Sequence, residues 1–304
     1  MAYDINRLRG SIAPVVTPFD QDLEVDYAAL RGLIEWQIRE GSHGISVTGT
    51  TGEPSSLRLQ ERVAVFQTTI DTVAGRVPVM LGTGSNNLEE TLELTHQAQA
   101  LGADAALVIV PYYNRPSQDG LYHFFLEVAK STTLPIVLYN IPGRTAVNLE
   151  PITMKRIRLK AENVVGVKEA NRDFEQVSMV LSVVGRDFLV YSGIEALCYP
   201  MLMLGGAGHI SATANLLPKA VANLYNWVHE EKYREALDLH FRLLALNQAL
   251  FWETNPGPVK AAMGLMGLIH PAVRLPLTLP GADLERRLSQ VLTDYGLLKS
   301  QEVS

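Results

Sequence analysis

Short runs of β-branched and aliphatic residues alternate with longer stretches of mixed polar and apolar residues along most of the chain. Eight runs have the length and composition of buried strands, the last being the weakest; they cover residues 11–16, 44–47, 77–81, 105–110, 136–139, 164–168, 188–191 and 208–210. The main stretches between them predict helices over residues 27–40, 59–74, 88–101, 120–131 and 174–184. This alternation is typical of repeated βα units with a parallel sheet.

The number of units indicates the fold. Eight strand–helix pairs in about 215 residues match the size of a (β/α)8 TIM barrel. A doubly wound open sheet is the alternative, but eight units would be many for it. The glycine-rich segment 82–87 after the third strand also lacks the third glycine of a dinucleotide fingerprint. We therefore predict an α/β fold with a barrel catalytic domain over residues 1–225.

The remaining residues, 226–304, contain no strand-like run and predict a C-terminal helical domain. Helical spacing covers residues 230–250, 258–268 and 283–297, and three prolines interrupt the connection before the last helix. Because this region is apolar along much of its length, we expect it to pack on the barrel or on another subunit.

Composition narrows the class of protein. The 304 residues are 47% hydrophobic and 19% charged, with a net charge of -6, which disfavours disorder and nucleic-acid partners. The single cysteine, Cys198, cannot form an intramolecular disulfide and fits a reducing compartment. The first residues lack the apolar core of a signal peptide, and no apolar run approaches the roughly 20 residues of a membrane span. We expect a cytoplasmic protein with no membrane partner.

The sixth strand ends in an unusual residue for a buried run, Lys168. Lysine is rarely buried without a partner, because burial disfavours the ammonium form. A neutral lysine amine can attack a carbonyl carbon and form an imine. The alternative from this segment alone is a lysine that extends past the strand end into solvent.

Other polar residues follow the ends of neighbouring strands, where a barrel places its active site. Thr50 and Thr51 follow the second strand within a glycine-flanked loop that could bind a small carboxylate. Tyr113 lies in a loop after the fourth strand, while Tyr139 ends the fifth and Arg144 follows it. A tyrosine can relay a proton and an arginine can hold a carboxylate. A simple Gly/Thr turn and tyrosines that only contribute to packing are the alternatives.

No pair of carboxylates and no histidine cluster accompanies these residues. Two-carboxylate hydrolysis and a catalytic metal would require such groups, and the seven histidines show no ligand spacing. We therefore predict no metal site and treat the histidines as structural or surface residues.

Taken together, the motifs resemble the dihydrodipicolinate synthase and N-acetylneuraminate lyase family of class I aldolases. The resemblance covers nearly the whole chain, through Arg144 and the segments 49–53, 111–116, 139–142, 166–170 and 255–260. It implies a (β/α)8 barrel with a C-terminal helical domain, no cofactor, and a homotetramer built from two tight dimers.

The resemblance also implies roles for four catalytic residues. Lys168 would form a Schiff base with pyruvate, and Tyr139 would shuttle the proton. Thr50 would connect Tyr139 to Tyr113, which would reach into the site of the neighbouring subunit.

Four further residues would bind substrates. Thr51 would hold the pyruvate carboxylate, and Arg144 would bind the carboxylate of an incoming aldehyde. Gly193 and Ile210 match positions that line the pocket.

These roles imply a pyruvate-dependent aldol condensation in which L-aspartate 4-semialdehyde is the expected aldehyde. The product would be 4-hydroxy-tetrahydrodipicolinate, an intermediate of lysine and diaminopimelate biosynthesis. Arg144 favours an aldehyde with a carboxylate over a neutral sugar. Pro54 and the pair Ile194–Glu195 depart from the family pattern and leave the aldehyde open. The alternatives are a related aldolase or dehydratase acting on a 2-oxo sugar acid or hydroxy-oxo acid, and a non-catalytic pyruvate-binding barrel.

Another departure concerns regulation. Lysine-inhibited relatives commonly carry histidines where this chain has Leu59 and Arg62, although Asn86, Glu90 and Tyr112 remain. Because Arg62 would repel the ammonium groups of L-lysine, we predict weak or absent feedback inhibition.

Overall fold

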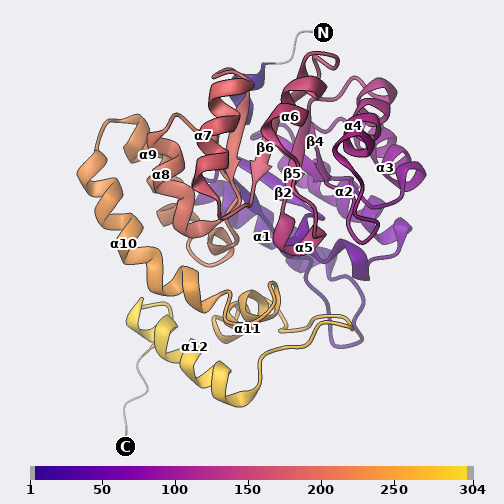
Figure 1. Ribbon diagram of the computed structural model, residues 1–304. Helices are drawn as coiled ribbons and strands as arrows, with labels where there is room; N and C mark the ends of the chain where they lie inside the picture. The colour runs from indigo at the N-terminus through magenta and orange to yellow at the C-terminus, as the bar shows by residue number, and fades with distance from the viewer. Residues whose placement is uncertain (1–3, 300–304) are drawn as a thin grey trace, which may run out of the picture.

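A closed barrel of eight parallel strands forms the centre of the protein (Figure 1), which confirms the predicted TIM barrel. The computed structural model describes residues 4–299. Each strand pairs with its neighbours in chain order, and β1 closes the barrel on β8. The strands are β1 (Gly10–Pro14), β2 (Gly44–Val47), β3 (Val79–Gly82), β4 (Ala105–Ile109), β5 (Ile136–Asn140), β6 (Val164–Glu169), β7 (Leu189–Ser192) and β8 (Gly208–His209).

The weak signal of the eighth strand has a structural reason. Strand β8 contains two residues, and a Cβ atom on Gly208 would collide with the backbone of Gly10 in β1. Gly208 also has a φ of 157°, which glycine adopts readily. Close contact between the first and last strands therefore requires a residue type that gives no strand signal.

Helices surround the barrel, and those predicted are present with ends within three residues of their predicted positions. The barrel helices are α1 (Tyr27–Arg39), α2 (Leu59–Val73), α3 (Leu88–Ala100), α4 (Gln118–Ser131), α5 (Pro142–Thr145), α6 (Pro151–Arg158), α7 (Phe174–Val183), α8 (Cys198–Met203) and α9 (Pro218–His229). Short 3₁₀ helices are η1 (Ile5–Leu8), η2 (Thr50–Gly52), η3 (Pro54–Ser56), η4 (Glu195–Leu197) and η5 (Ala212–Asn215). The sequence did not predict α5, α6, α8 and α9; three of these begin with proline, which is compatible with a first helical position.

Three helices follow the barrel: α10 (Tyr233–Ala249), α11 (Gly257–Leu265) and α12 (Ala282–Asp294). Figure 1 shows α11 and α12 at the end of the molecule near α5, which is the end where the barrel strands finish. The proposed domain boundary at residue 225 falls within α9, and the division into two domains remains a prediction.

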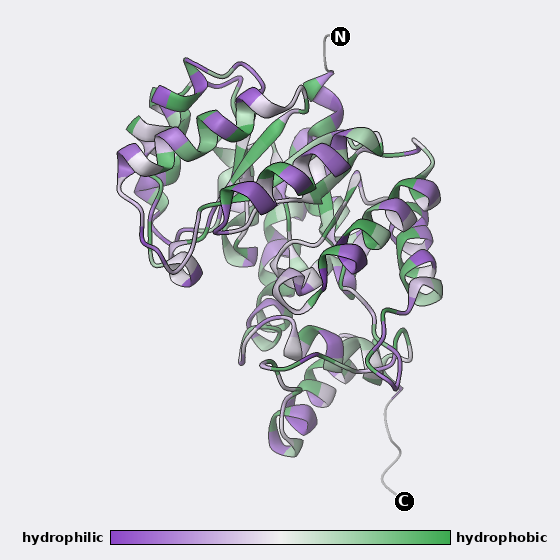
Figure 2. Cartoon of the chain, turned by 90° about the vertical axis from the view of Figure 1, so that its right-hand side faces the viewer, coloured by the Kyte–Doolittle hydropathy of each residue, from purple (hydrophilic) through white to green (hydrophobic). Residues whose placement is uncertain are grey.

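Apolar side chains form two main layers. One fills the barrel interior and includes Ile12, Met80, Leu107 and Tyr139, while a larger one lies between the strands and the helices. Figure 2 shows the corresponding hydrophobic colour on strands and mixed colour along the outer helices. Within residues 4–299, no helix combines the length and apolarity that crossing a membrane requires.

Candidate active site

Lys168 lies on β6, where all six residues are buried. Its exposed fraction is 6%, so the side chain does not extend into solvent as the alternative interpretation required. Lys168 is the direct partner of Tyr139 in the register of β5 and β6, and its Nζ atom lies 4.3 Å from the centroid of the Tyr139 ring. The barrel therefore holds an amine against a phenol ring in a largely dry environment.

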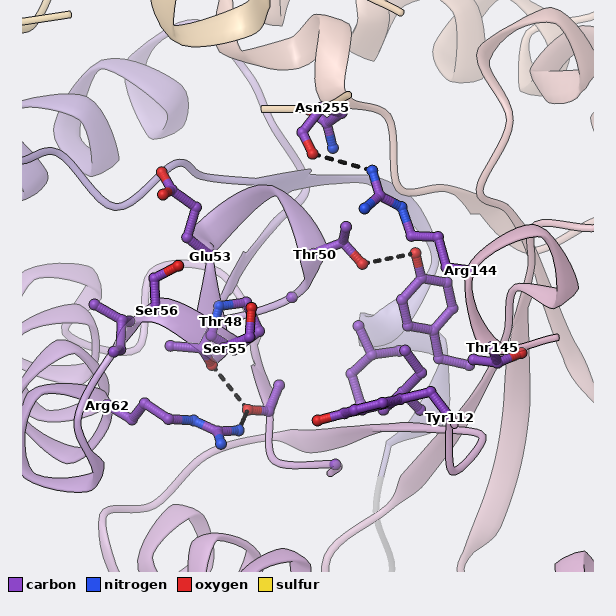
Figure 3. A pocket seen from close by; sticks show the side chains of 18 of the residues that line it. Thr48, Thr50, Glu53, Ser55, Ser56, Arg62, Tyr112, Arg144, Thr145 and Asn255 are labelled. Atoms are coloured by element: carbon purple, nitrogen blue, oxygen red, sulfur yellow. Dashed lines mark hydrogen bonds between the residues drawn. The ribbon is translucent and has the colours of Figure 1, made fainter. Parts of the chain in front are cut away.

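The Tyr139 hydroxyl contacts a second hydroxyl. It lies 3.2 Å from Oγ1 of Thr50, and the Tyr139 side chain is buried. Thr50 begins η2, which two residues separate from the end of β2, and Figure 3 shows its side chain at the cavity. Two groups that can each donate and accept a proton are thus linked at the rim of the barrel.

Thr51 and Arg144 are joined by a residue to which the sequence assigned no role, Asn255. The Asn255 side-chain amide donates to Oγ1 of Thr51 at 3.0 Å, and Nη2 of Arg144 donates to the Asn255 carbonyl at 3.0 Å. Thr51 and Asn255 are buried, while Arg144 lines the cavity (Figure 3). Because Asn255 lies between α10 and α11, the C-terminal helical region takes part in building the site.

Gly193 lies close to Lys168, and Ile210 belongs to the apolar cluster that includes Tyr139. A Cβ atom on Gly193 would stand 2.9 Å from Cε of Lys168, so the glycine leaves room for the lysine side chain. Ile210 is buried in the same apolar cluster as Tyr139, and its backbone N–H donates to the Ser192 carbonyl at 2.8 Å. Gly193 is therefore beside the Lys168 side chain, and Ile210 belongs to the apolar interior of the barrel.

Tyr113 is the site residue that this single chain does not bring to the others. Its side chain is 87% exposed, and its φ of 72° is rare for a residue with a side chain. The neighbouring Tyr112 instead lines the cavity in Figure 3.

The cavity at this rim has a volume of about 420 Å³. A volume in that range suits a small-molecule ligand. Its polar lining residues include Thr48, Thr50, Ser55, Ser56, Arg62, Glu90, Tyr112, Tyr139, Arg144 and Asn255. Arg62 is 4% exposed and donates to Glu90 at 2.8 Å and to the Gly82 carbonyl at 3.2 Å. The cavity thus extends from the Tyr139–Arg144 side toward a paired arginine and glutamate.

Glu169 is a buried carboxyl group that the sequence interpretation did not use. It follows Lys168 on β6, and side chains alternate between the two faces of a strand, so it points away from the lysine. Burial raises the pKa of Glu169 to about 7, while hydrogen bonds from Gln176 and Asn140 oppose the shift. The sequence could have indicated this buried carboxyl group, because Glu169 directly follows Lys168 at the end of an apolar run.

A second buried carboxyl group, Glu195, lies in η4 after β7. It accepts a hydrogen bond from the Ala212 backbone at 2.8 Å. Burial raises the pKa of Glu195, while hydrogen bonds from backbone N–H groups, that of Ala212 first, oppose the shift. Across residues 4–299, no three His, Cys, Asp or Glu side chains are grouped so that they could hold a metal ion.

Known proteins are similar to this chain in sequence and fold. The model of the dihydrodipicolinate synthetase family matches residues 7–294. The chain is 48% identical over 295 residues to a 4-hydroxy-tetrahydrodipicolinate synthase of Thermus thermophilus, covering 97% of this chain and 98% of the relative. The solved dihydrodipicolinate synthase of Aquifex aeolicus has a TM-score of 0.94 and 41% identity, with 96% and 100% coverage. A chloride-inhibited dihydrodipicolinate synthase of Acinetobacter baumannii, complexed with pyruvate, has a TM-score of 0.93 and 39% identity, with 95% and 99% coverage.

Proposed function

The chain belongs to the dihydrodipicolinate synthetase family, and we propose that the buried Lys168 is the nucleophile of its reaction. The enzyme is a Schiff-base-forming lyase that condenses pyruvate with L-aspartate 4-semialdehyde to give 4-hydroxy-tetrahydrodipicolinate, a step of lysine and diaminopimelate biosynthesis. The relatives' names favour this reaction over other class I aldol or dehydratase reactions and over a non-catalytic barrel. The observation that carries the assignment of Lys168 is its burial beside Tyr139.

The first half of the reaction forms an enamine. The neutral Lys168 amine attacks the keto carbon of pyruvate, and Tyr139 donates a proton to the oxygen that leaves as water. Loss of a methyl proton from the resulting imine produces a nucleophilic carbon. The contact between the Tyr139 and Thr50 hydroxyls supports proton transfer along this pair, because each hydroxyl can accept one proton while it donates another.

The second half joins the two substrates. The enamine carbon attacks the aldehyde carbon, and the aldehyde oxygen takes up a proton. The amino group of the second substrate then attacks the imine carbon, which closes the ring and releases the Lys168 amine. No atom or electron from a cofactor enters this sequence.

Two side chains would orient the substrates. Thr51 accepts a hydrogen bond from Asn255, which leaves its own hydroxyl proton free to donate to the pyruvate carboxylate. Arg144 uses one N–H on the Asn255 carbonyl and keeps others for the carboxylate of the aldehyde. Gly193 and Ile210 would shape the pocket around the lysine.

An oligomer would complete the site. The exposure of Tyr113 supports its insertion into a neighbouring subunit's cavity, where it would meet Thr50, within a homotetramer built as a dimer of dimers. The expected partners are the two small-molecule substrates, without a cofactor, a nucleic acid or a membrane. A cytoplasmic location likewise stays a prediction.

Trapping of the imine tests the nucleophile. Incubation with pyruvate and borohydride, followed by peptide mass spectrometry, should place a reduced pyruvate adduct on Lys168. A Lys168→Arg variant should give no adduct and serves as the control. A pyruvate adduct on another lysine, or none in the unmodified enzyme, would contradict the assignment. Turnover with aspartate semialdehyde in a coupled assay then tests the aldehyde.

A further inference from the structure

A fully buried ion pair joins the loop after β2 to helix α11. Nζ of Lys260 lies 2.5 Å from Oε1 of Glu53, and both side chains are 0% exposed. Nζ also donates to the Ala272 carbonyl at 2.8 Å and lies 3.9 Å from the centroid of the Phe19 ring. Lysine and glutamate are almost never fully buried unless paired, and here the ammonium has an anion, a carbonyl and an aromatic face around it.

Glu53 has a backbone conformation that its residue type does not favour. Its φ and ψ are 54° and 46°, in the left-handed region, where glycine is the residue with no steric cost. Glu53 separates η2 from η3, and its backbone N–H donates to the Thr50 carbonyl at 3.2 Å. A change in this residue's backbone would therefore move Thr50, whose side chain contacts Tyr139.

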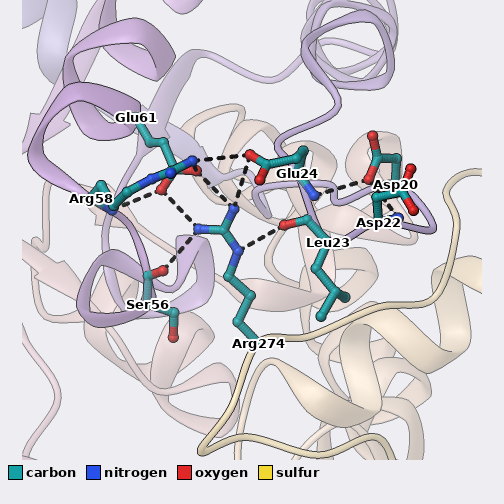
Figure 4. A network of polar contacts seen from close by, with 8 residues as sticks. All are labelled: Asp20, Asp22, Leu23, Glu24, Ser56, Arg58, Glu61 and Arg274. Carbon is teal, nitrogen blue, oxygen red and sulfur yellow. Dashed lines mark hydrogen bonds and ion pairs between the residues drawn. The ribbon is translucent and has the colours of Figure 1, made fainter.

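The C-terminal region contacts the same loop at two further places. Asn255 holds Thr51, as described above. The Arg274 backbone N–H donates to Oε2 of Glu53 at 3.2 Å, while its guanidinium donates to the Ser56 carbonyl at 3.0 Å and to both Glu61 oxygens at 2.8 Å. Figure 4 shows Arg274 extending from the C-terminal segment toward Ser56 and Glu61.

We propose that the Glu53–Lys260 pair is a positioning device through which the C-terminal helical region holds Thr50 and Thr51 in place for pyruvate. The inference rests on the proposed function of those two threonines. Glu53 lines the cavity, but its carboxylate contacts Lys260 and the Arg274 backbone, so the pair would act through the loop that Glu53 belongs to.

The energy of a buried ion pair indicates that Glu53 and Lys260 contribute more to side-chain orientation than to the free energy of folding. Desolvation of two buried charges offsets most of their attraction, so such pairs often contribute little to stability compared with apolar residues. Burial also lowers the pKa of Lys260 to about 8, while the Glu53 carboxylate opposes the shift. The pair instead fixes the orientation of the Glu53 side chain, because two fully buried charges have few alternative partners.

The test uses the Lys260→Met variant of the full chain, which removes the ammonium and keeps most of the side-chain volume. We expect the KM for pyruvate to rise about tenfold or more, since small misplacements of binding groups are costly, while kcat stays within about threefold. At saturating pyruvate the borohydride adduct on Lys168 should still form. An unchanged KM in the folded variant overturns the proposal.

Leu292→Ala is the matched control for lost stability. Leu292 is fully buried in α12, and its truncation leaves a cavity that lowers the melting temperature. We expect its KM for pyruvate to equal that of the unmodified enzyme at a temperature where both are folded. A KM increase as large as that of Lys260→Met would reduce the pair to a general stabilising contact and overturn the proposal.

Glu53→Gln completes the comparison, because it keeps the side-chain shape and removes the charge. We expect a KM increase of about threefold or more, and a double variant with Lys260→Met no worse than Lys260→Met alone. Additive KM effects overturn the proposal. If Lys260→Met does not fold, the Glu53→Gln variant tests the proposal alone. An unchanged KM for pyruvate in Glu53→Gln then overturns the positioning role.

The two proposals fail in different ways. If the unmodified enzyme gives no adduct on Lys168, the proposed function is wrong. If it gives the adduct and both pair variants keep the normal KM for pyruvate, only the positioning role is wrong.

Discussion

The side-chain nitrogen of Lys168 lies 4.3 Å from the centre of the Tyr139 ring, because the two residues are register partners on β5 and β6. Side chains of register partners leave a parallel sheet on the same face and close together. The proposed imine-forming lysine and the proposed proton donor are therefore brought together by strand pairing, whereas Thr50, the hydroxyl partner of Tyr139, comes from the segment that follows β2.

Removal of the Tyr139 hydroxyl should slow the chemical step. Tyr139→Phe keeps the buried ring and is expected to lower kcat by roughly 10²–10⁴-fold, the range of general acid–base catalysis. Steady-state turnover and the rate of borohydride trapping measure the effect. Tyr225→Phe, which removes a hydroxyl bonded to His229 on α9, is the matched control and should keep normal turnover. Equal rates for Tyr139→Phe and the unmodified enzyme would exclude the proton-transfer role.

A methyl group at Gly193 should displace the lysine. The new Cβ atom of Gly193→Ala would lie 2.9 Å from Cε of Lys168, closer than carbon atoms normally approach. We expect kcat/KM to fall about tenfold or more, because the amine must move from its attacking position. Gly281→Ala places its Cβ in open space and should leave turnover unchanged. Normal imine trapping in Gly193→Ala would show that the lysine has more room than its contacts indicate.

Replacement of Arg144 should weaken binding of the aldehyde without changing the reaction with pyruvate. Arg144→Met removes the cation but leaves Lys168 and Tyr139 in place, so pyruvate should still form its adduct at the normal rate. The KM for aspartate semialdehyde is expected to rise roughly 10²-fold or more, the scale of losing a charge-assisted pair. Kinetics with each substrate varied in turn distinguish the effects. A selective rise in the KM for pyruvate would instead assign Arg144 to the first substrate.

The pH dependence of stability should contain a contribution from Glu169. Because burial raises its pKa to about 7, the folded protein keeps a proton that the unfolded chain loses near pH 4.5. Raising the pH between these values therefore favours unfolding, by on the order of 3 kcal/mol in full. Denaturation of the unmodified enzyme and Glu169→Gln at several pH values gives the difference in slope. Parallel curves would mean that Glu169 titrates normally in the folded state.

L-Lysine should inhibit weakly or not at all. Glu90, the anion at that end of the cavity, already accepts a hydrogen bond from the buried Arg62, so a ligand ammonium would meet a neutralised carboxylate beside a guanidinium. Turnover at increasing L-lysine concentration tests this, and half-inhibition at low millimolar concentration would refute it. Arg62→Gln, which removes the cation, is expected to increase any inhibition that exists.

The local parts of the fold were predictable. Strands such as β4 and β5 consist mainly of β-branched and aliphatic residues, and their largely buried state follows from that composition. Because Lys168 lies near the carboxyl end of its strand, counting the strands placed it at the rim where we propose the active site. Helix α9 was not predicted, because proline usually interrupts a helix. Pro218 is the first residue of α9, a position where proline is compatible with a helix.

By itself, the sequence determined the barrel and indicated the candidate reactive groups, because hydrophobic period and residue chemistry act over a few neighbouring positions. Only the tertiary structure decided which distant groups meet. Asn255 binds Thr51, which is 204 positions away in the sequence, and Lys260 forms a fully buried ion pair with Glu53. Amide, hydroxyl and charged groups have many possible partners in a sequence, and burial removes all but the few that packing brings within reach.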